Sequence, residues 1–209
     1  FNANAPKEMD RSIRDLENKE VVGYILDLRG NPGGLLEASI TIARQWMNQG
    51  IIVRTQTKNG LKQIRRANGS ALTNLPVVVI VDQGSASASE ILSGAIQDNK
   101  RGVLVGQKTF GKGLVQSVRA LSDGSGLTVT IAKYLTSNGR DIHKNGIQPD
   151  VLSSFSKEDA FKFNPSDLGT RKDTQYKAAE TELFKLLKAS NNRMSYHSNS
   201  SNIKYALKL

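Results

Sequence analysis

Short apolar runs alternate with stretches of helical periodicity along this chain. Residues 76–82 form a nearly unbroken β-branched run, which is typical of a strand buried on both faces. Residues 90–97 then repeat apolar side chains at three- and four-residue spacing, which predicts one face of an amphipathic helix. A second strand–turn–helix unit is predicted at 21–28 and 35–47. These alternating elements predict a mixed α/β fold.

The rest of the chain shows patterns that predict further helices and hairpins. Asn59-Gly60 is the strongest short hairpin signal in the chain, and it joins two predicted strands. Asn138-Gly139 predicts a further tight turn. Other predicted strands and helices lie at 7–18, 51–57, 62–66, 103–106, 127–132 and 174–189. Residues 190–201, rich in Ser and Asn, are expected to be flexible.

Composition narrows the class of protein. The 209 residues can build one substantial core. The net charge of +10 raises the possibility of nucleic-acid binding, but the basic residues are spread along the chain, without zinc-ligand spacing or an RNA-recognition aromatic pattern. We therefore expect a solvated basic surface and no nucleic-acid partner, with weak, salt-dependent attraction to acidic partners or to a membrane surface. The absence of cysteine excludes disulfides and thiol chemistry.

The candidate chemistry begins at the strand-to-helix turn. Ser85, Ser87 and Ser89 lie where backbone N–H groups are free at a helix start. Ser87-Ala-Ser-Glu90 also fits a capping box, which is the structural interpretation of the same serine. In the next loop, Lys112 stands between two glycines. Histidine is nearly absent (His143 and His197 only), so a nucleophilic serine would take lysine as its base.

A second glycine turn, at residues 30–34, admits two interpretations. Glycine turns before helices bind anions, but this one lacks the lysine and Ser/Thr of a phosphate-binding loop and the dinucleotide-binding spacing. Its free N–H groups could instead stabilise the oxyanion of a tetrahedral intermediate. Asp98, at the end of the predicted helix, is interpreted as structural and not as a triad acid.

Several of these segments together resemble the signature blocks of one protease family. The segments are Asp27–Gly34, Gly84–Ile91, Thr109–Gln116, Val129–Tyr134, Gly139–Ile142 and Gly146–Asp150. In this order they resemble the carboxyl-terminal processing (tail-specific) serine proteases, in particular the cyanobacterial and plastid branch, over about residues 1–152. The resemblance implies Ser87 as nucleophile, Lys112 as general base and Gln116 as the residue that orients the lysine.

The resemblance also implies an oxyanion hole and a fold. The amides of Ala88 and Gly33, with Gly34 as the close alternative to Gly33, would hold the oxyanion, while Asp27 and Arg29 would brace the turn. The implied fold is a mixed α/β, ClpP/crotonase-like catalytic core. We expect this core at residues 1–155 and a C-terminal extension with one amphipathic helix at 156–209.

The family resemblance further implies a substrate and a compartment. It implies cleavage near the apolar C-terminal tail of a protein, outside the cytoplasm, in the periplasm or thylakoid lumen. In the photosynthetic branch the substrate is a photosystem II reaction-centre precursor. The chain begins at Phe1 and not at methionine, so we expect a fragment or trimmed chain without the family's PDZ domain. Neither a metal nor another cofactor is expected.

A lysine base requires a special environment. The ordinary lysine pKa of ~10.4 leaves the amine charged near neutrality, and burial lowers it. We expect Phe110, Leu114 and Val115 to provide this burial, with Gln116 as a neutral partner. Two alternatives remain open: a non-catalytic binding or scaffold domain of the same fold, and a crotonase-type acyl-CoA enzyme that has no use for a Ser87–Lys112 pair.

Overall fold

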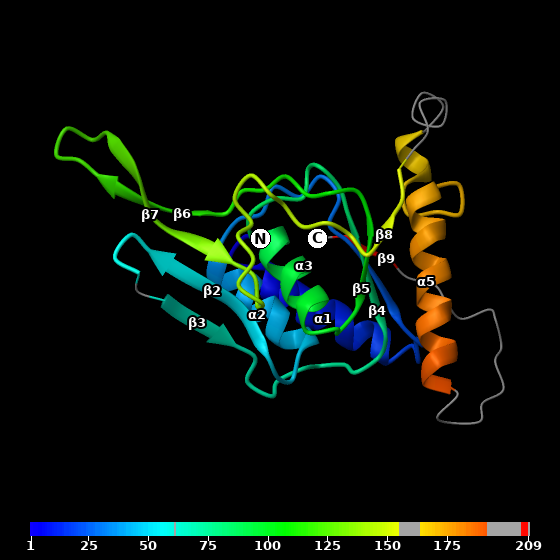
Figure 1. Ribbon diagram of the computed structural model, residues 1–209. Helices are drawn as coiled ribbons and strands as arrows, with labels where there is room; N and C mark the ends of the chain where they lie inside the picture. Colours follow the sequence, from blue (N-terminus) through cyan, green and yellow to red (C-terminus); the bar gives the residue numbers. More distant parts are fainter. Residues whose placement is uncertain (61, 155–163, 192–205, 209) are drawn as a thin grey trace.

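The computed structural model describes residues 1–60, 62–154, 164–191 and 206–208, and they form two sheets and their covering helices (Figure 1). The observed fold is mixed α/β, as the pattern predicts. Most of the predicted flexible end lies outside the described residues.

The first sheet is parallel and forms the centre of the body. Its strand order is β8-β5-β4-β1-β9, and every pairing is parallel. The strands are β1 (Tyr24–Asp27), β4 (Val77–Val81), β5 (Val103–Gly106), β8 (Val151–Leu152) and β9 (Ala206–Lys208). All five residues of β4 are buried, which confirms that this strand is covered on both faces.

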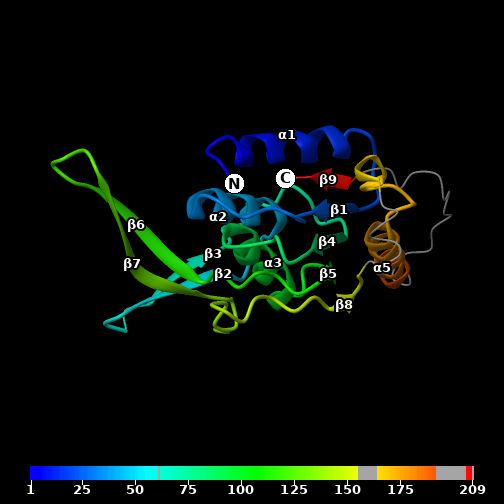
Figure 2. The same cartoon turned by 90° about the horizontal axis from the view of Figure 1, so that it is seen from above.

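Helices cover the two faces of this sheet (Figure 2). The first face packs against α1 (Ala5–Glu17), α2 (Leu36–Trp46) and α3 (Ala88–Asp98), and the second against α5 (Thr174–Asn191), which follows the 3₁₀ turn η1 (Pro165–Asp167). Val77 and Val79 point to the first face, whereas Val78 joins the α5 cluster. The predicted helix at 174–189 therefore forms and packs on the core.

The predicted amphipathic faces are the ones that are buried. Met9, Ile13 and Leu16 of α1 lie in the core, and they are the three residues that the sequence placed on one helical face. Burial of apolar surface, at roughly 25 cal/mol per Å², is the main term that holds such a helix on the sheet. Within the described residues, none of the helices has the length and apolarity needed to cross a bilayer.

The second sheet is antiparallel and extends away from the body. Its order is β3-β2-β7-β6, with β2 (Ile51–Thr57), β3 (Lys62–Arg66), β6 (Leu114–Ala120) and β7 (Gly126–Leu135). The hairpin at 51–66 forms as predicted. The hairpin of β6 and β7, residues 114–135, projects into solvent beyond the other strands, and we call it the arm (Figure 1).

Candidate active site

Ser87 adopts a strained backbone conformation between β4 and α3. Its φ is 55° and its ψ is −112°, a region that residues with a side chain rarely occupy. Ser85 and Ser89 are fully buried, whereas Ser87 is only half-buried. Of the three serines, Ser87 is therefore the one presented to solvent at the helix start.

The two flanking serines have structural roles. The Ser85 hydroxyl donates to Leu28 O (2.7 Å) and accepts from Asp82 N–H (3.0 Å). The Ser89 hydroxyl donates to Asn31 O (3.0 Å). Both hydroxyls tie the Ser87 turn to the segment that follows β1.

Glu90 joins the Ser87 turn to the lysine loop. Its side chain is fully buried, and Oε2 accepts the N–H groups of Ser87 (2.8 Å) and Lys112 (2.8 Å). Oε1 accepts from the Thr109 hydroxyl (2.5 Å) and from Gly111 N–H (2.7 Å). One carboxylate thus supplies its half of the predicted capping box and also fixes the loop that carries Lys112.

The Lys112 loop differs from the expected setting in one respect. Lys112 is exposed and Phe110 is 66% exposed, while Leu114 and Val115 are only half-buried. The expected burial of Lys112 is therefore wrong for this structure, because the lysine stands just before β6, where the sheet ends. Gly113 is required here, since a Cβ at this position would lie 2.4 Å from His143 N.

The glycine turn after β1 packs directly on Ser87. A Cβ added to Gly33 would lie 2.8 Å from the Ser87 Cβ and 2.7 Å from Ala88 N, so only glycine allows this approach. Ala88 occupies the first position of α3, where a helix leaves its N–H groups unpaired. The Gly33 N–H donates to Asn31 Oδ1 (3.0 Å). The two proposed oxyanion donors are thus neighbours at the Ser87 turn.

A buried ionic cluster next to the glycine turn supports it. The Arg29 guanidinium pairs with Asp27 (2.6 Å) and Asp173 (2.7 Å) and donates to Gln175 Oε1 (3.0 Å). Burial alone would raise the pKa of Asp173, but hydrogen bonds from Arg29 and from the N–H groups of Gly169 and Tyr176 lower it on balance. Asp27 and Arg29 brace the turn as predicted, and they also link it to the start of α5.

Three other residues were considered from the sequence, and the structure gives none of them a bond to Ser87 or Lys112 within the described residues. Gln116 is exposed on β6, and its side chain makes no hydrogen bond within the described part of the chain. Asp98 pairs with Arg140 and accepts Asn138 N–H (2.8 Å), which fits its structural interpretation. His143 packs against Gly113, a proximity that the sequence did not indicate.

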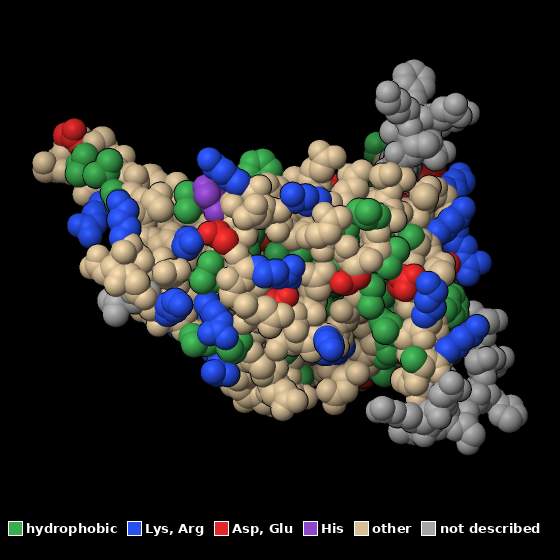
Figure 3. Space-filling model, in the orientation of Figure 1, with side chains coloured by type: hydrophobic (Ala, Val, Ile, Leu, Met, Phe, Trp, Pro, Cys, Tyr) green, Lys and Arg blue, Asp and Glu red, His purple; other side chains and the backbone are tan. Residues whose placement is uncertain are grey.

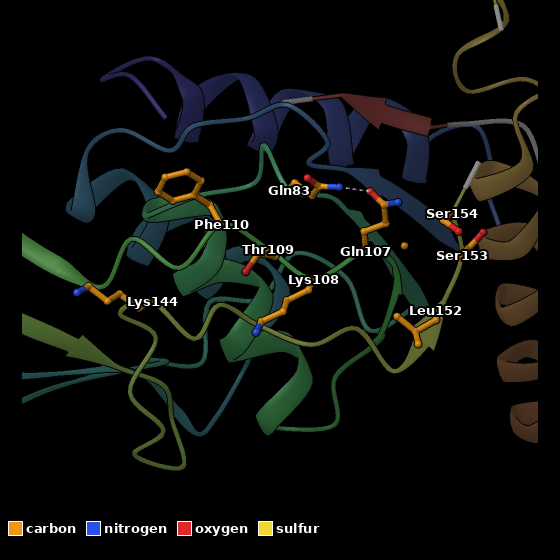
Figure 4. Close-up of a pocket in the computed structure, with 10 residues that line it drawn as sticks. Gln83, Gln107, Lys108, Thr109, Phe110, Lys144, Leu152, Ser153 and Ser154 are labelled. Carbon is orange, nitrogen blue, oxygen red and sulfur yellow. Dashed lines mark hydrogen bonds between the residues drawn. The ribbon is translucent and has the colours of Figure 1, made fainter. Parts of the chain in front are cut away.

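A groove of about 660 Å³ lies beside the Ser87 turn, over the carboxyl ends of β4, β5 and β8 (Figure 4). Phe110, at one end, donates its N–H to Ser85 O (3.0 Å), and Leu152 lies toward the other end. Neither Ser87 nor Lys112 lines the groove. Its lining residues are Gln83, Gly106, Gln107, Lys108, Thr109, Phe110, Lys144, Leu152, Ser153 and Ser154.

Ser87 is an accessible, strained serine beside helix-start amides, and Glu90 binds its backbone N–H together with that of Lys112. A serine in such a setting, with a lysine in the adjoining loop, is typical of hydrolases that act through a covalent serine intermediate. The sequence profile of peptidase family S41 matches residues 1–153. The chain belongs to this family.

Individual relatives agree with this assignment. The chain is 51% identical over 179 residues to a carboxyl-terminal-processing protease of Synechocystis sp. (strain ATCC 27184 / PCC 6803 / Kazusa), covering 86% of this chain and 41% of that protein. It is 44% identical to the chloroplastic carboxyl-terminal-processing peptidase 3 of Arabidopsis thaliana, over 88% of this chain and 37% of that protein.

A solved structure of a photosystem II D1 C-terminal processing protease matches with a TM-score of 0.70 and 43% identity. That match covers 74% of this chain and 40% of the other. The chain thus spans about two fifths of the length of these relatives.

Two features of the site went unrecognised in the sequence. Glu90 was visible only as a capping residue, because its bonds to Gly111 and Lys112 join segments about twenty residues apart. Asp173 is separated from Arg29 by 144 residues. An Asp shortly before a predicted helix signals a cap, but it says nothing about a distant arginine.

Proposed function

We propose that this chain is the catalytic core of a serine endopeptidase that cleaves proteins near their C-termini with a Ser87–Lys112 dyad. The observation that carries the proposal is the Glu90 carboxylate, which binds the backbone of both residues at 2.8 Å. Family membership and the accessible, strained Ser87 support the same conclusion.

In the proposed reaction, the Lys112 amine removes the proton of the Ser87 hydroxyl while Oγ attacks the scissile carbonyl carbon. The N–H groups of Ala88 and Gly33 stabilise the oxyanion, for which Gly33 N–H exchanges its bond to Asn31. Lys112 then gives the proton to the leaving amine. Water attacks the acyl-enzyme with the same lysine as base, and the acid product leaves.

Lys112 must lose its proton before it can act as a base. In this structure it is exposed, so we propose that bound substrate covers it and removes water from the amine. Gln116 is proposed to turn toward the lysine in the same step and to orient it without adding charge. Both events belong to the substrate-bound enzyme.

The proposed substrates are proteins with apolar C-terminal tails, cleaved outside the cytoplasm. The names of the chloroplastic and photosystem II relatives favour a photosystem II reaction-centre precursor and the thylakoid lumen or periplasm. On the face shown in Figure 3, Lys and Arg side chains are spread over the arm, the body and α5 instead of forming one block. This distribution favours at most peripheral, salt-dependent contact with an anionic membrane.

The test uses the full-length protein that contains this chain. Wild type and Ser87→Ala are incubated with an unfolded protein that carries an apolar C-terminal tail, and the products are identified by mass spectrometry. We expect one main cut near the tail, lost in Ser87→Ala. Cleavage that survives in Ser87→Ala would refute the proposed nucleophile, and intact substrate with the wild type would favour a scaffold domain.

A further inference from the structure

The edges of the two sheets are not equally protected against strand addition. Natural proteins block exposed edges with charges, with proline or by keeping the strands short. In the described residues, β8 and β9 are short, at two and three residues. The edge strand β3 carries three cations among its five residues, Lys62, Arg65 and Arg66.

The fourth edge, β6, lacks these protections. It runs for seven residues, Leu114–Ala120, contains no proline and has Arg119 as its single charged residue. Its register is irregular only between Val115 and Gln116, next to the active site. A long edge with so little charge is a template for a further strand.

The β6 edge also begins at the proposed base. Leu114 follows Lys112 by two residues, and Gly113 O accepts Tyr134 N–H (2.7 Å), which attaches this start to the sheet. One continuous segment therefore runs from the groove at residues 106–110, past Lys112, to the free edge. A chain leaving the groove past Lys112 would meet this edge directly.

The outward groups of the edge can be assigned from the hairpin turn. Leu121 N–H donates to Ser125 O (2.8 Å), so hydrogen-bonded pairs recur at every second residue before it. By this alternation Ser117 and Arg119 bond to β7, while the N–H and C=O groups of Val118 and Ala120 point outward. The Val118 side chain is 73% exposed.

We propose that an extended segment of the protein substrate adds to β6 as a further strand of the antiparallel sheet. This inference rests on the proposed function for the identity of its ligand. Seven residues at ~3.3 Å each give an edge of about 23 Å. Recognition is through the substrate backbone, and an apolar side chain of the substrate finds the exposed Val118 beside it on β6.

Strand addition also explains how Lys112, which is exposed in this structure, would become covered when substrate binds. A substrate strand on β6 lies over its first residues and covers Lys112 in the same event. Only a chain that can become extended fits this edge, because the ladder requires free backbone N–H and C=O groups. The proposed substrate class is therefore an unfolded, apolar tail and not a folded surface.

Binding can be tested separately from cleavage. Full-length Ser87→Ala protein receives the photo-crosslinker p-benzoylphenylalanine at Val118, or at Ile64 on the charged edge β3 as the matched control. A 14-residue apolar peptide with a free carboxyl terminus and an N-terminal fluorescent label is added, and labelled protein is measured after irradiation. We expect peptide capture at position 118 and only background at position 64. Equal capture, or none at 118, would overturn the proposal.

A second measurement avoids any change in the arm. The same peptide is N-methylated at one position at a time, and its Kd for Ser87→Ala protein is measured by fluorescence anisotropy. Loss of one ladder hydrogen bond is expected to weaken binding about three- to tenfold, at alternate peptide positions over about seven residues. If N-methylation weakens binding equally at all positions, or at none, strand addition is refuted, even if the wild type cleaves the peptide. If the wild type does not cleave the peptide, only the proposed function is refuted.

Discussion

Arg29 and Asp173 form a buried ion pair that connects the glycine turn beside Ser87 to the first residues of α5. Their closest atoms are 2.7 Å apart, and the Asp173 side chain is fully buried. Asp173 also accepts the N–H groups of Gln175 and Tyr176, so it caps α5 while it holds the arginine. The C-terminal helix is therefore part of the support of the glycine turn beside Ser87.

Replacing Asp173 should destabilise the protein. Asp173→Ala leaves Asp27 as the one ionic partner of Arg29 within the described residues and uncaps α5, and we expect a loss of about 3 kcal/mol in the free energy of unfolding. Urea denaturation measures this loss. The control is Arg171→Ala, which removes an exposed pair with Glu180 and should change stability by less than about 0.5 kcal/mol. A loss in Asp173→Ala as small as the control's would contradict a supporting role.

The same pair predicts an acid dependence of stability. The folded-state pKa of Asp173 is lowered, because its hydrogen bonds and the Arg29 charge outweigh the effect of burial. Its contribution is therefore complete above the unfolded pKa of ~3.9 and is lost as the pH falls through the lower folded value. Below about pH 4, the unfolding free energy of wild type should fall more steeply than that of Asp173→Asn. Parallel curves in this range would exclude the pair as the cause.

The strained Ser87 backbone predicts an unusual glycine effect. Ser87→Gly relieves the positive φ and should stabilise the protein by about 1 kcal/mol relative to Ser87→Ala, while both variants are inactive. Thermal unfolding should show an increase of about 2 to 4 °C for a chain of this size. Ser89→Gly, within α3, is the matched control and should lower the melting temperature. A Ser87→Gly variant no more stable than Ser87→Ala would show that the strain is absent.

Glu90 should matter for both stability and reactivity. In Glu90→Gln, an amide NH₂ replaces one acceptor oxygen, so donors among Ser87, Gly111 and Lys112 lose their partner. We expect a loss of about 2 to 4 kcal/mol in stability. Labelling of Ser87 by a fluorophosphonate probe should slow about 100-fold, because the segments that carry Ser87 and Lys112 lose their common anchor.

The control for this prediction is Glu8→Gln on the exposed face of α1. Its labelling rate and stability should match those of the wild type. If Glu90→Gln is labelled as fast as this control, the carboxylate does not position the dyad.

Local sequence patterns predicted most of the fold, but they did not predict the contacts between segments that are distant in the sequence. The hairpin at 51–66 and the strand and helix that flank Ser87 follow from turn chemistry and apolar periodicity, which act within a few residues. The Arg29–Asp173 pair joins positions 144 residues apart, and no local pattern encodes it.

The environment of Lys112 could not be predicted from local sequence patterns either. Phe110 and Leu114 beside it in sequence suggested an apolar environment, but their exposure depends on where the second sheet ends. Because β6 is the last strand of that sheet, no further strand covers the lysine in the described residues. The order of strands in a sheet is set by tertiary pairing and not by the residues of one loop.

The proposed Ser87–Lys112 dyad can be tested with the single substitution Lys112→Arg. Arginine keeps the positive charge but is not deprotonated in proteins, so it cannot serve as the base. Full-length wild type, Lys112→Arg and the exposed control Lys100→Arg are compared by the rate at which they cleave the apolar tail substrate. We expect a loss of about 10²- to 10⁴-fold in Lys112→Arg and a wild-type rate in Lys100→Arg. Cleavage by Lys112→Arg at the rate of the control would contradict the lysine-base mechanism.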